Sequence, residues 1–247
     1  MKLLKFPFAY LAVFSFALLS CQKSENHNLS PQKGIVKSSS SSFDTIGAHH
    51  NSMLDDYYEI YSLTGPQVDL SSKIDIANSY LQSIGNPYDL DFIYNEVPQL
   101  LHTQQLVQDS AFSLAEAKIE ADSMHNNHLM SDNIYPYVTA FFDSLEIHGS
   151  VSQLEEMILS LESVIGSDSN LSSEEQDGLL MVMSISKASI GYQPTYVEIY
   201  GIPWYEKDLL GAALALSTGT VEFAAFFGPW AAAGVFVGVS AVASMVP

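Results

Sequence analysis

The chain has 247 residues and a formal net charge of −19, with 28 acidic residues against nine Lys and no Arg. Such a charge repels nucleic-acid phosphates, so we expect no nucleic-acid partner. One cysteine excludes an intramolecular disulfide, while the length suffices for one large or two small domains with a hydrophobic core.

The first 21 residues have the three parts of a secretory signal. Two lysines precede an apolar run over residues 6–19, and Ser20 stands directly before Cys21. The segment Leu18-Leu19-Ser20-Cys21 resembles the lipobox of bacterial lipoproteins, in which the cysteine thiol receives a diacylglycerol and becomes the first mature residue. The resemblance implies a signal peptide over 1–20 and lipid attachment at Cys21.

The same resemblance implies a location in the cell. We expect an exported protein that is held at a bacterial membrane by its N-terminal lipid, at the outer membrane, with the body facing the periplasm or the outside. The alternatives are a buried or free thiol at Cys21 and an uncleaved apolar anchor. Neither explains why the cysteine falls at the cleavage position.

Residues 21–43 are polar and contain a run of five serines over 38–42. Such a segment cannot bury enough apolar surface to order itself, which predicts a disordered tether. Its three lysines against one glutamate suit a segment near anionic lipid.

Residues 44–207 form an acidic segment in which apolar side chains recur every three or four positions, the period of an amphipathic helix. No run of alternating residues indicates a sheet. The sequence therefore predicts an all-α, multi-helix bundle of six to eight helices. These helices are expected over 45–61, 69–84, 90–105 with a kink at Pro98, 110–124, 133–148, 150–166 and 172–190.

Capping residues support several of these helix starts. Ser172 stands three residues before Glu175, the spacing of a capping box, and Gly85 is expected to end a helix. The other expected caps are Asp44 or Thr45, Asp69 or Ser71, and Ser150 or Ser152.

Two stretches of this body carry a second resemblance. Ile46-Gly47-Ala48-His49-His50-Asn51-Ser52-Met53-Leu54 is similar to the "IG-x-x-HN-x-x-L" opening of a loose set of small helical lipoproteins from Bacteroidota-type bacteria. Residues 171–189 are similar to the later "LS-x-EE … SI-x-K-x-S" helix of that set. The set implies a helical fold and a lipoprotein address, and it supplies no activity.

The last 40 residues, 208–247, are apolar and rich in small side chains. Gly211, Ala215 and Gly219 recur at four-residue spacing, and Gly228-Pro229 signals a turn, so a hydrophobic helical hairpin is expected. It is either the buried core of the bundle or an element that inserts into a membrane or self-associates. The pattern resembles the glycine-zipper segments of pore-forming and bacteriocin-like peptides.

Few residues suggest chemistry. Asp122, His125 and His128 could ligate zinc or iron if one helix carried all three, although a polar loop with two histidines needs no metal. Ser184 and Lys187 match the S-x-x-K motif of penicillin-interacting enzymes without its companion motifs, and Lys187 is better interpreted as the exposed end of a helix. We expect no catalytic residue, no bound metal and no cofactor.

A further pair of histidines lies in the first predicted helix, ahead of Asp55 and Asp56. Alternation around a helix predicts that His50 packs inward and that His49 is solvated.

These features predict a lipid-anchored envelope protein that works as a non-enzymatic binding or interaction module, with an envelope protein as a candidate partner. The alternative is a membrane-inserting or self-assembling protein that acts through residues 208–247. An enzyme is the third hypothesis.

Overall fold

The computed structural model describes residues 40–61, 68–86, 89–96, 101–102, 105–106, 113–147, 150–192, 212–213 and 229–245. Within these ranges the regular structure is helical and contains no strand, which confirms the predicted all-α multi-helix fold. The lipobox at Leu18–Cys21, the tether up to residue 39, Pro98 and, apart from 212–213, the first arm of the predicted hairpin lie outside the described residues.

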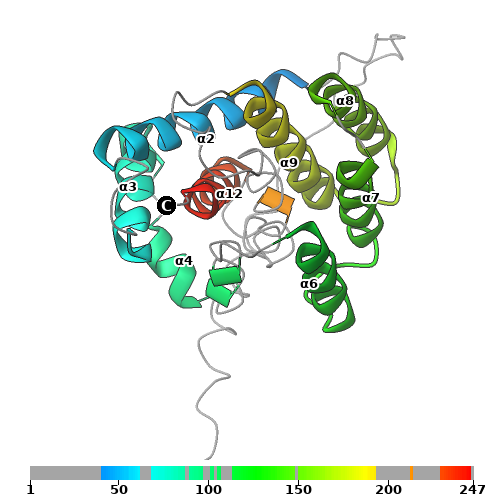
Figure 1. Cartoon of the computed structure of the whole chain (residues 1–247), viewed down its shortest axis with the longest axis horizontal. Helices are drawn as coiled ribbons and strands as arrows, with labels where there is room; N and C mark the ends of the chain where they lie inside the picture. Colours follow the sequence, from blue (N-terminus) through cyan, green and yellow to red (C-terminus); the bar gives the residue numbers. More distant parts are fainter. Residues whose placement is uncertain are drawn as a thin grey trace, which may run out of the picture. The chain divides into compact units, whose positions relative to one another are not determined.

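Eight helices have described bounds, and α12 lies among four of the others (Figure 1). It packs against α2, α3, α4 and α9, while α8 packs on α9, and α7 contacts both α6 and α8. The bounds are α2 Ser40–Ile60, α3 Leu70–Ser83, α4 Leu90–Glu96, α6 Leu114–Asn126, α7 Tyr135–Ile147, α8 Val151–Ser167, α9 Ser173–Gly191 and α12 Pro229–Ser244.

Three of the predicted caps are confirmed. Asp69 caps α3 by accepting the backbone N–H of Ser72 at 2.9 Å, and Ser150 caps α8. Ser172 accepts the N–H of Glu175 at 3.1 Å, and the Glu175 carboxylate accepts the N–H of Ser172 at 2.9 Å. These local contacts satisfy backbone donors that the first turn of a helix leaves free.

Two helix starts differ from the prediction. Helix α6 begins at Leu114 rather than near residue 110, because Ser113 and Glu116 form a capping box at this position. Helix α2 begins at Ser40, inside the serine run, ahead of the expected Asp44 or Thr45 cap. A long-range contact accompanies this early start, since Phe43 packs against the core.

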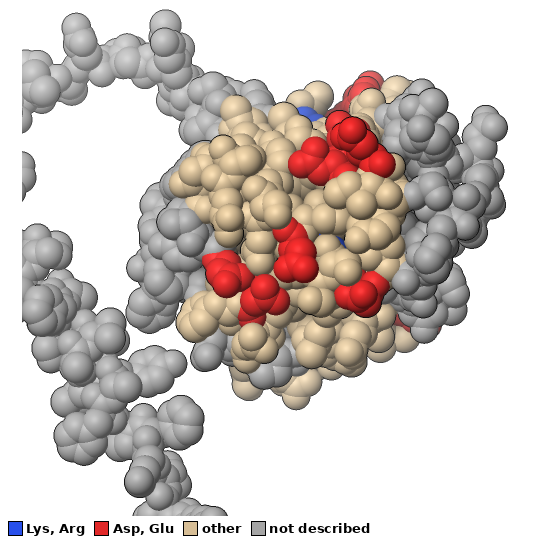
Figure 2. All heavy atoms as spheres, turned by 90° about the vertical axis from the view of Figure 1, so that its left-hand side faces the viewer, with Lys and Arg blue, Asp and Glu red and all other residues tan. Residues whose placement is uncertain are grey.

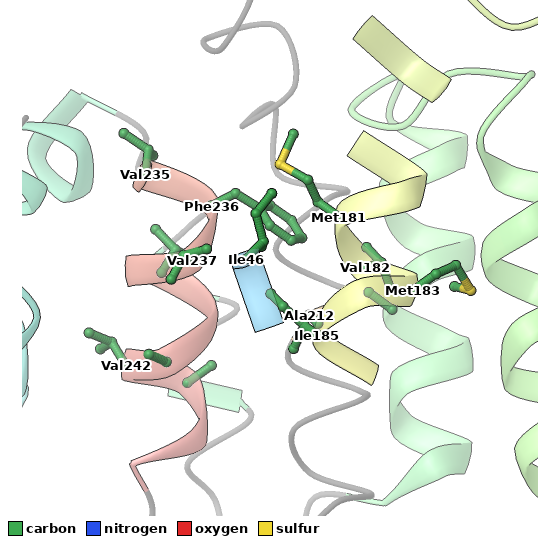
Figure 3. Packing of buried hydrophobic residues seen from close by; sticks show 14 of the residues in the cluster. Ile46, Met181, Val182, Met183, Ile185, Ala212, Val235, Phe236, Val237 and Val242 are labelled. Carbon is green, nitrogen blue, oxygen red and sulfur yellow. The ribbon is translucent and has the colours of Figure 1, made fainter. Parts of the chain in front are cut away.

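Helix α12 is part of the core, as the buried-hairpin alternative predicted for this segment. Residues 234–245 are all buried, and Figure 3 shows Phe236, Ile46 and Met181 converging between α12 and α9. The glycine face is covered: a Cβ at Gly238 would lie 2.8 Å from the Leu90 side chain. No helix in the described ranges combines the length and the apolar character that a bilayer crossing requires.

Candidate functional site

The three predicted metal-ligand candidates do not come together. His128 follows the end of α6 with a φ of 59°, so it does not share a helical face with Asp122 and His125. The Asp122 carboxylate accepts the Tyr135 hydroxyl at 2.6 Å, and His125 Nε2 lies 3.0 Å from Asp132 Oδ1. Among the residues with described positions, no three His, Cys, Asp or Glu side chains are arranged to hold a metal ion.

The adjacent histidines of α2 take different roles. His50 is fully buried, as predicted, with Nε2 3.3 Å from Ser244 Oγ and Nδ1 3.1 Å from Asn51 Oδ1. The prediction that His49 is solvated is wrong, because His49 is half-buried and its Nδ1 lies 2.8 Å from the Tyr80 hydroxyl. Tyr80 belongs to α3, so a contact between helices covers the His49 side chain, which the helical periodicity of α2 alone predicts to be exposed.

The S-x-x-K pair has structural roles. Ser184 Oγ donates to the Phe43 carbonyl at 2.5 Å and accepts the Gly47 N–H at 3.2 Å, which joins α9 to α2. Lys187 is not an exposed helix end as predicted: it is half-buried, with Nζ 2.7 Å from Glu162 Oε1. The serine hydroxyl is therefore used in helix packing.

The two stretches that resemble the helical lipoprotein set pack against each other. Besides the Gly47 contact, Asn51 Nδ2 donates to the Ala188 carbonyl at 3.1 Å, and Leu54 is fully buried. The positions of the resemblance thus supply the glycine that allows close approach and the hydrogen bonds that join α2 to α9.

A cavity of about 420 Å³ lies where α2, α9 and α12 meet the C-terminal end of α3. We call it the α2–α9–α12 cavity. The side chains in its wall come from four segments that are far apart in the sequence. They are Phe43, Thr45, Ile46, His49, Leu81, Ile84, Asn86, Gln176, Asp177, Leu180, Met181, Ala233, Gly234 and Val237.

The helical period explains why these residues face the cavity together. On α9, Gln176 and Asp177 stand one turn before Leu180 and Met181, so all four occupy one face of the helix. On α12, Ala233 and Gly234 contribute little bulk to the wall of the cavity. We call the buried lining residues the inner wall, which is apolar apart from Asn86, and the half-buried lining residues, Asp177 among them, the rim.

The acidic and basic side chains of the described lining are of one sign, negative. Asp177 is its only Asp or Glu, and no Lys or Arg is found among the described lining residues. Burial, and then the nearby Glu174 carboxylate, raise the pKa of Asp177. Gln176 is held in place because its Nε2 donates to the Ile165 carbonyl at 2.7 Å. The site combines a mainly apolar interior with a carboxylate on its rim.

The sequence alone does not predict this cavity. Residues 176–181 of α9 have the pattern of an ordinary amphipathic helix. The small residues in 208–247 predict close helix packing rather than a cavity. The one available signal was Asp177, an acidic residue that directly follows Gln176 on the face that turns toward the core.

Acidic side chains also dominate part of the outer surface. On the face shown in Figure 2 they form several groups, and basic side chains are sparse. A shallow groove of about 310 Å³ between α2 and α3 contains Asp56, Glu59 and Asp75 in its wall. These charges favour cationic over anionic molecules near the protein.

Comparison with known proteins gives no relative. No protein-family model, no curated protein and no solved structure matches the chain.

Proposed function

We propose that this protein is a lipid-anchored envelope protein whose helical body binds a small, mainly apolar molecule in the α2–α9–α12 cavity, without catalysing a reaction. The cavity is the observation that carries the proposal. Its volume of about 420 Å³ falls in the range of about 300–1,000 Å³ that small-molecule sites occupy. Such sites combine apolar walls with a few polar groups, as this one does.

The wall has the composition that a binding role needs. Ile46, Leu81 and Val237 are buried and offer apolar surface, while Asn86, Gln176 and Asp177 offer polar atoms around it. An apolar ligand would gain free energy by leaving water for these walls, at about 25 cal/mol per Å² of surface that it buries. The polar atoms would fix its orientation.

Binding is tested with a neutral ligand and with variants in which a larger side chain fills the cavity. We expect phenylbutanol to bind the full-length chain in lipid nanodiscs, after subtraction of heat from empty discs in isothermal titration calorimetry. Ala233→Phe should abolish this binding because the ring occupies the cavity. Leu180→Trp, which fills it from α9, is a second variant in case the first does not fold.

The matched control is Ala115→Phe, which adds the same ring to an exposed position of α6. We expect it to bind phenylbutanol like the parent chain. Absence of phenylbutanol binding by the parent, or equal binding by the folded cavity variants, would overturn the proposed binding role.

The lipid anchor is a separate part of the proposal and depends on the lipobox. We expect Cys21→Ser to move the protein from the membrane pellet to the supernatant after alkaline extraction, because no thiol remains for acylation. Ser20→Ala keeps a small residue before the cysteine and should behave as the parent. A Cys21→Ser protein that stays in the pellet after residues 1–20 have been removed, as mass spectrometry of its N-terminus would show, would contradict lipid anchoring at this residue.

A further inference from the structure

We infer that the ligand of the α2–α9–α12 cavity is an organic monocation, an amine with a compact apolar body whose ammonium group lies beside the Asp177 carboxylate. This inference rests on the proposed binding function and names the chemical class of its ligand. Three features carry it: the position of Asp177, the charges around it and the apolar inner wall.

Asp177 lies where the polar head of a ligand in the cavity would contact it. It is half-buried and lines the cavity, one turn before Leu180 and Met181 on the same face of α9. An amphiphile with its apolar part against Met181 and Val237 would bring its polar end toward the rim, where Asp177 and Gln176 lie.

The surroundings disfavour an anion and favour a cation. The Glu174 carboxylate acts on Asp177 and adds negative charge at the same end of α9. Lys187, the lysine of α9, is engaged by Glu162. A carboxylate that is partly removed from water is stabilised by an opposite charge, so an ammonium group would gain there and a carboxylate ligand would be repelled.

Among the described lining residues, the other titratable group is His49, which has a hydrogen-bond partner on α3. His49 lines the cavity from α2, but its Nδ1 lies 2.8 Å from the Tyr80 hydroxyl, so this imidazole is oriented by α3. The net charge of −19 acts in the same direction as Asp177, since it concentrates cations around the protein. The electric field of Asp177 and that of the whole protein therefore both favour a positively charged ligand.

A series of ligands with one apolar body tests the charge directly. We expect phenylbutylamine to bind the full-length chain in nanodiscs about tenfold more tightly than phenylbutanol, a difference of about 1.4 kcal/mol, and phenylbutanoate to bind most weakly. Asp177→Asn should reduce the affinity for the amine to that for the alcohol. Asp132→Asn removes one charge at an exposed loop and should preserve the amine preference.

The outcomes separate the two proposals. If phenylbutanol binds and Ala233→Phe removes it, but the amine has no advantage or Asp177→Asn keeps that advantage, the cation inference is wrong and the binding role stands. If Asp132→Asn removes the preference as well, the selectivity comes from overall charge, and the role of Asp177 is overturned. If none of the three ligands binds, the binding role itself is wrong.

Discussion

Replacing Gly47 by alanine is expected to lower the free energy of unfolding by about 3 kcal/mol, the upper part of the range for overpacked cores. Gly47 is buried where α2 meets α9. A Cβ at this position would lie 2.5 Å from the Ala188 Cβ and 2.5 Å from the Ser184 carbonyl oxygen. Backbone and Cβ atoms cannot rotate away as a flexible side chain does, so the two helices would have to separate.

Separation would also weaken a hydrogen bond. The Gly47 N–H donates to Ser184 Oγ at 3.2 Å, and that hydroxyl donates in turn to the Phe43 carbonyl. The complete loss of a partner by a buried donor costs about 1–3 kcal/mol, so the weakening of this bond is one reason to expect the upper part of the range.

Urea unfolding followed by circular dichroism measures the effect. Gly166→Ala is the matched control, because a Cβ on that residue of α8 would meet no atom within 4 Å. We expect Gly166→Ala to stabilise the protein by about 0.5 kcal/mol, since alanine favours the helix over glycine. Parent-like stability of Gly47→Ala would contradict the close contact between α2 and α9.

Replacing Lys73 by methionine is expected to raise the free energy of unfolding at pH 7 by about 2–3 kcal/mol. Lys73 lies in the first turns of α3 and is fully buried. Its Nζ has no hydrogen-bond partner within the part of the chain that the structure describes. Methionine keeps the apolar stem and removes the ammonium group, which is costly to take out of water.

The pH dependence identifies the cause. Burial lowers the pKa of Lys73 from 10.5 to about 8, against an opposing effect of the Asp69 carboxylate. Between these two values the unfolded chain holds a proton that the folded chain has released, so the parent gains stability as the pH rises. The advantage of the Met variant should therefore be constant below pH 8 and should shrink from pH 8 toward 10.5.

Comparing parent and variant by urea unfolding at pH 7 and pH 10 isolates this lysine, because both proteins share all other titrating groups. Lys118→Met is the control: Lys118 Nζ lies 2.8 Å from Asp143 and 2.6 Å from Glu146, so its removal should bring no gain. A Lys73→Met advantage that is absent at pH 7, or that stays the same at pH 10, would show that Lys73 carries no desolvation cost.

Local signals predicted the helical elements well. Asp69, Ser150 and Ser172 cap helices as expected, because a cap depends on a side chain and on backbone donors two or three residues away. The early start of α2 at Ser40 could not be predicted in this way. The start of α2 is accompanied by a hydrogen bond from the Ser184 hydroxyl to the Phe43 carbonyl, and these two residues are 141 positions apart in the chain.

The candidate site could not be predicted from short-range patterns in the sequence. Its walls come from α2, α3, α9 and α12, and a cavity depends on the space between helices rather than on the pattern along any one of them. The same reason separates the sequence-predicted metal candidates, since His128 leaves the helix that carries Asp122 and His125.

The sequence by itself determined the helical class and most helix starts, because periodicity and capping are short-range properties of the chain. It also supplies the prediction of a lipid anchor at Cys21. Only the tertiary structure decided that the apolar helix at residues 229–244 lies among four other helices, and that His49 and Lys73 are covered. Burial depends on which helices meet, and those contacts join residues that the sequence keeps far apart.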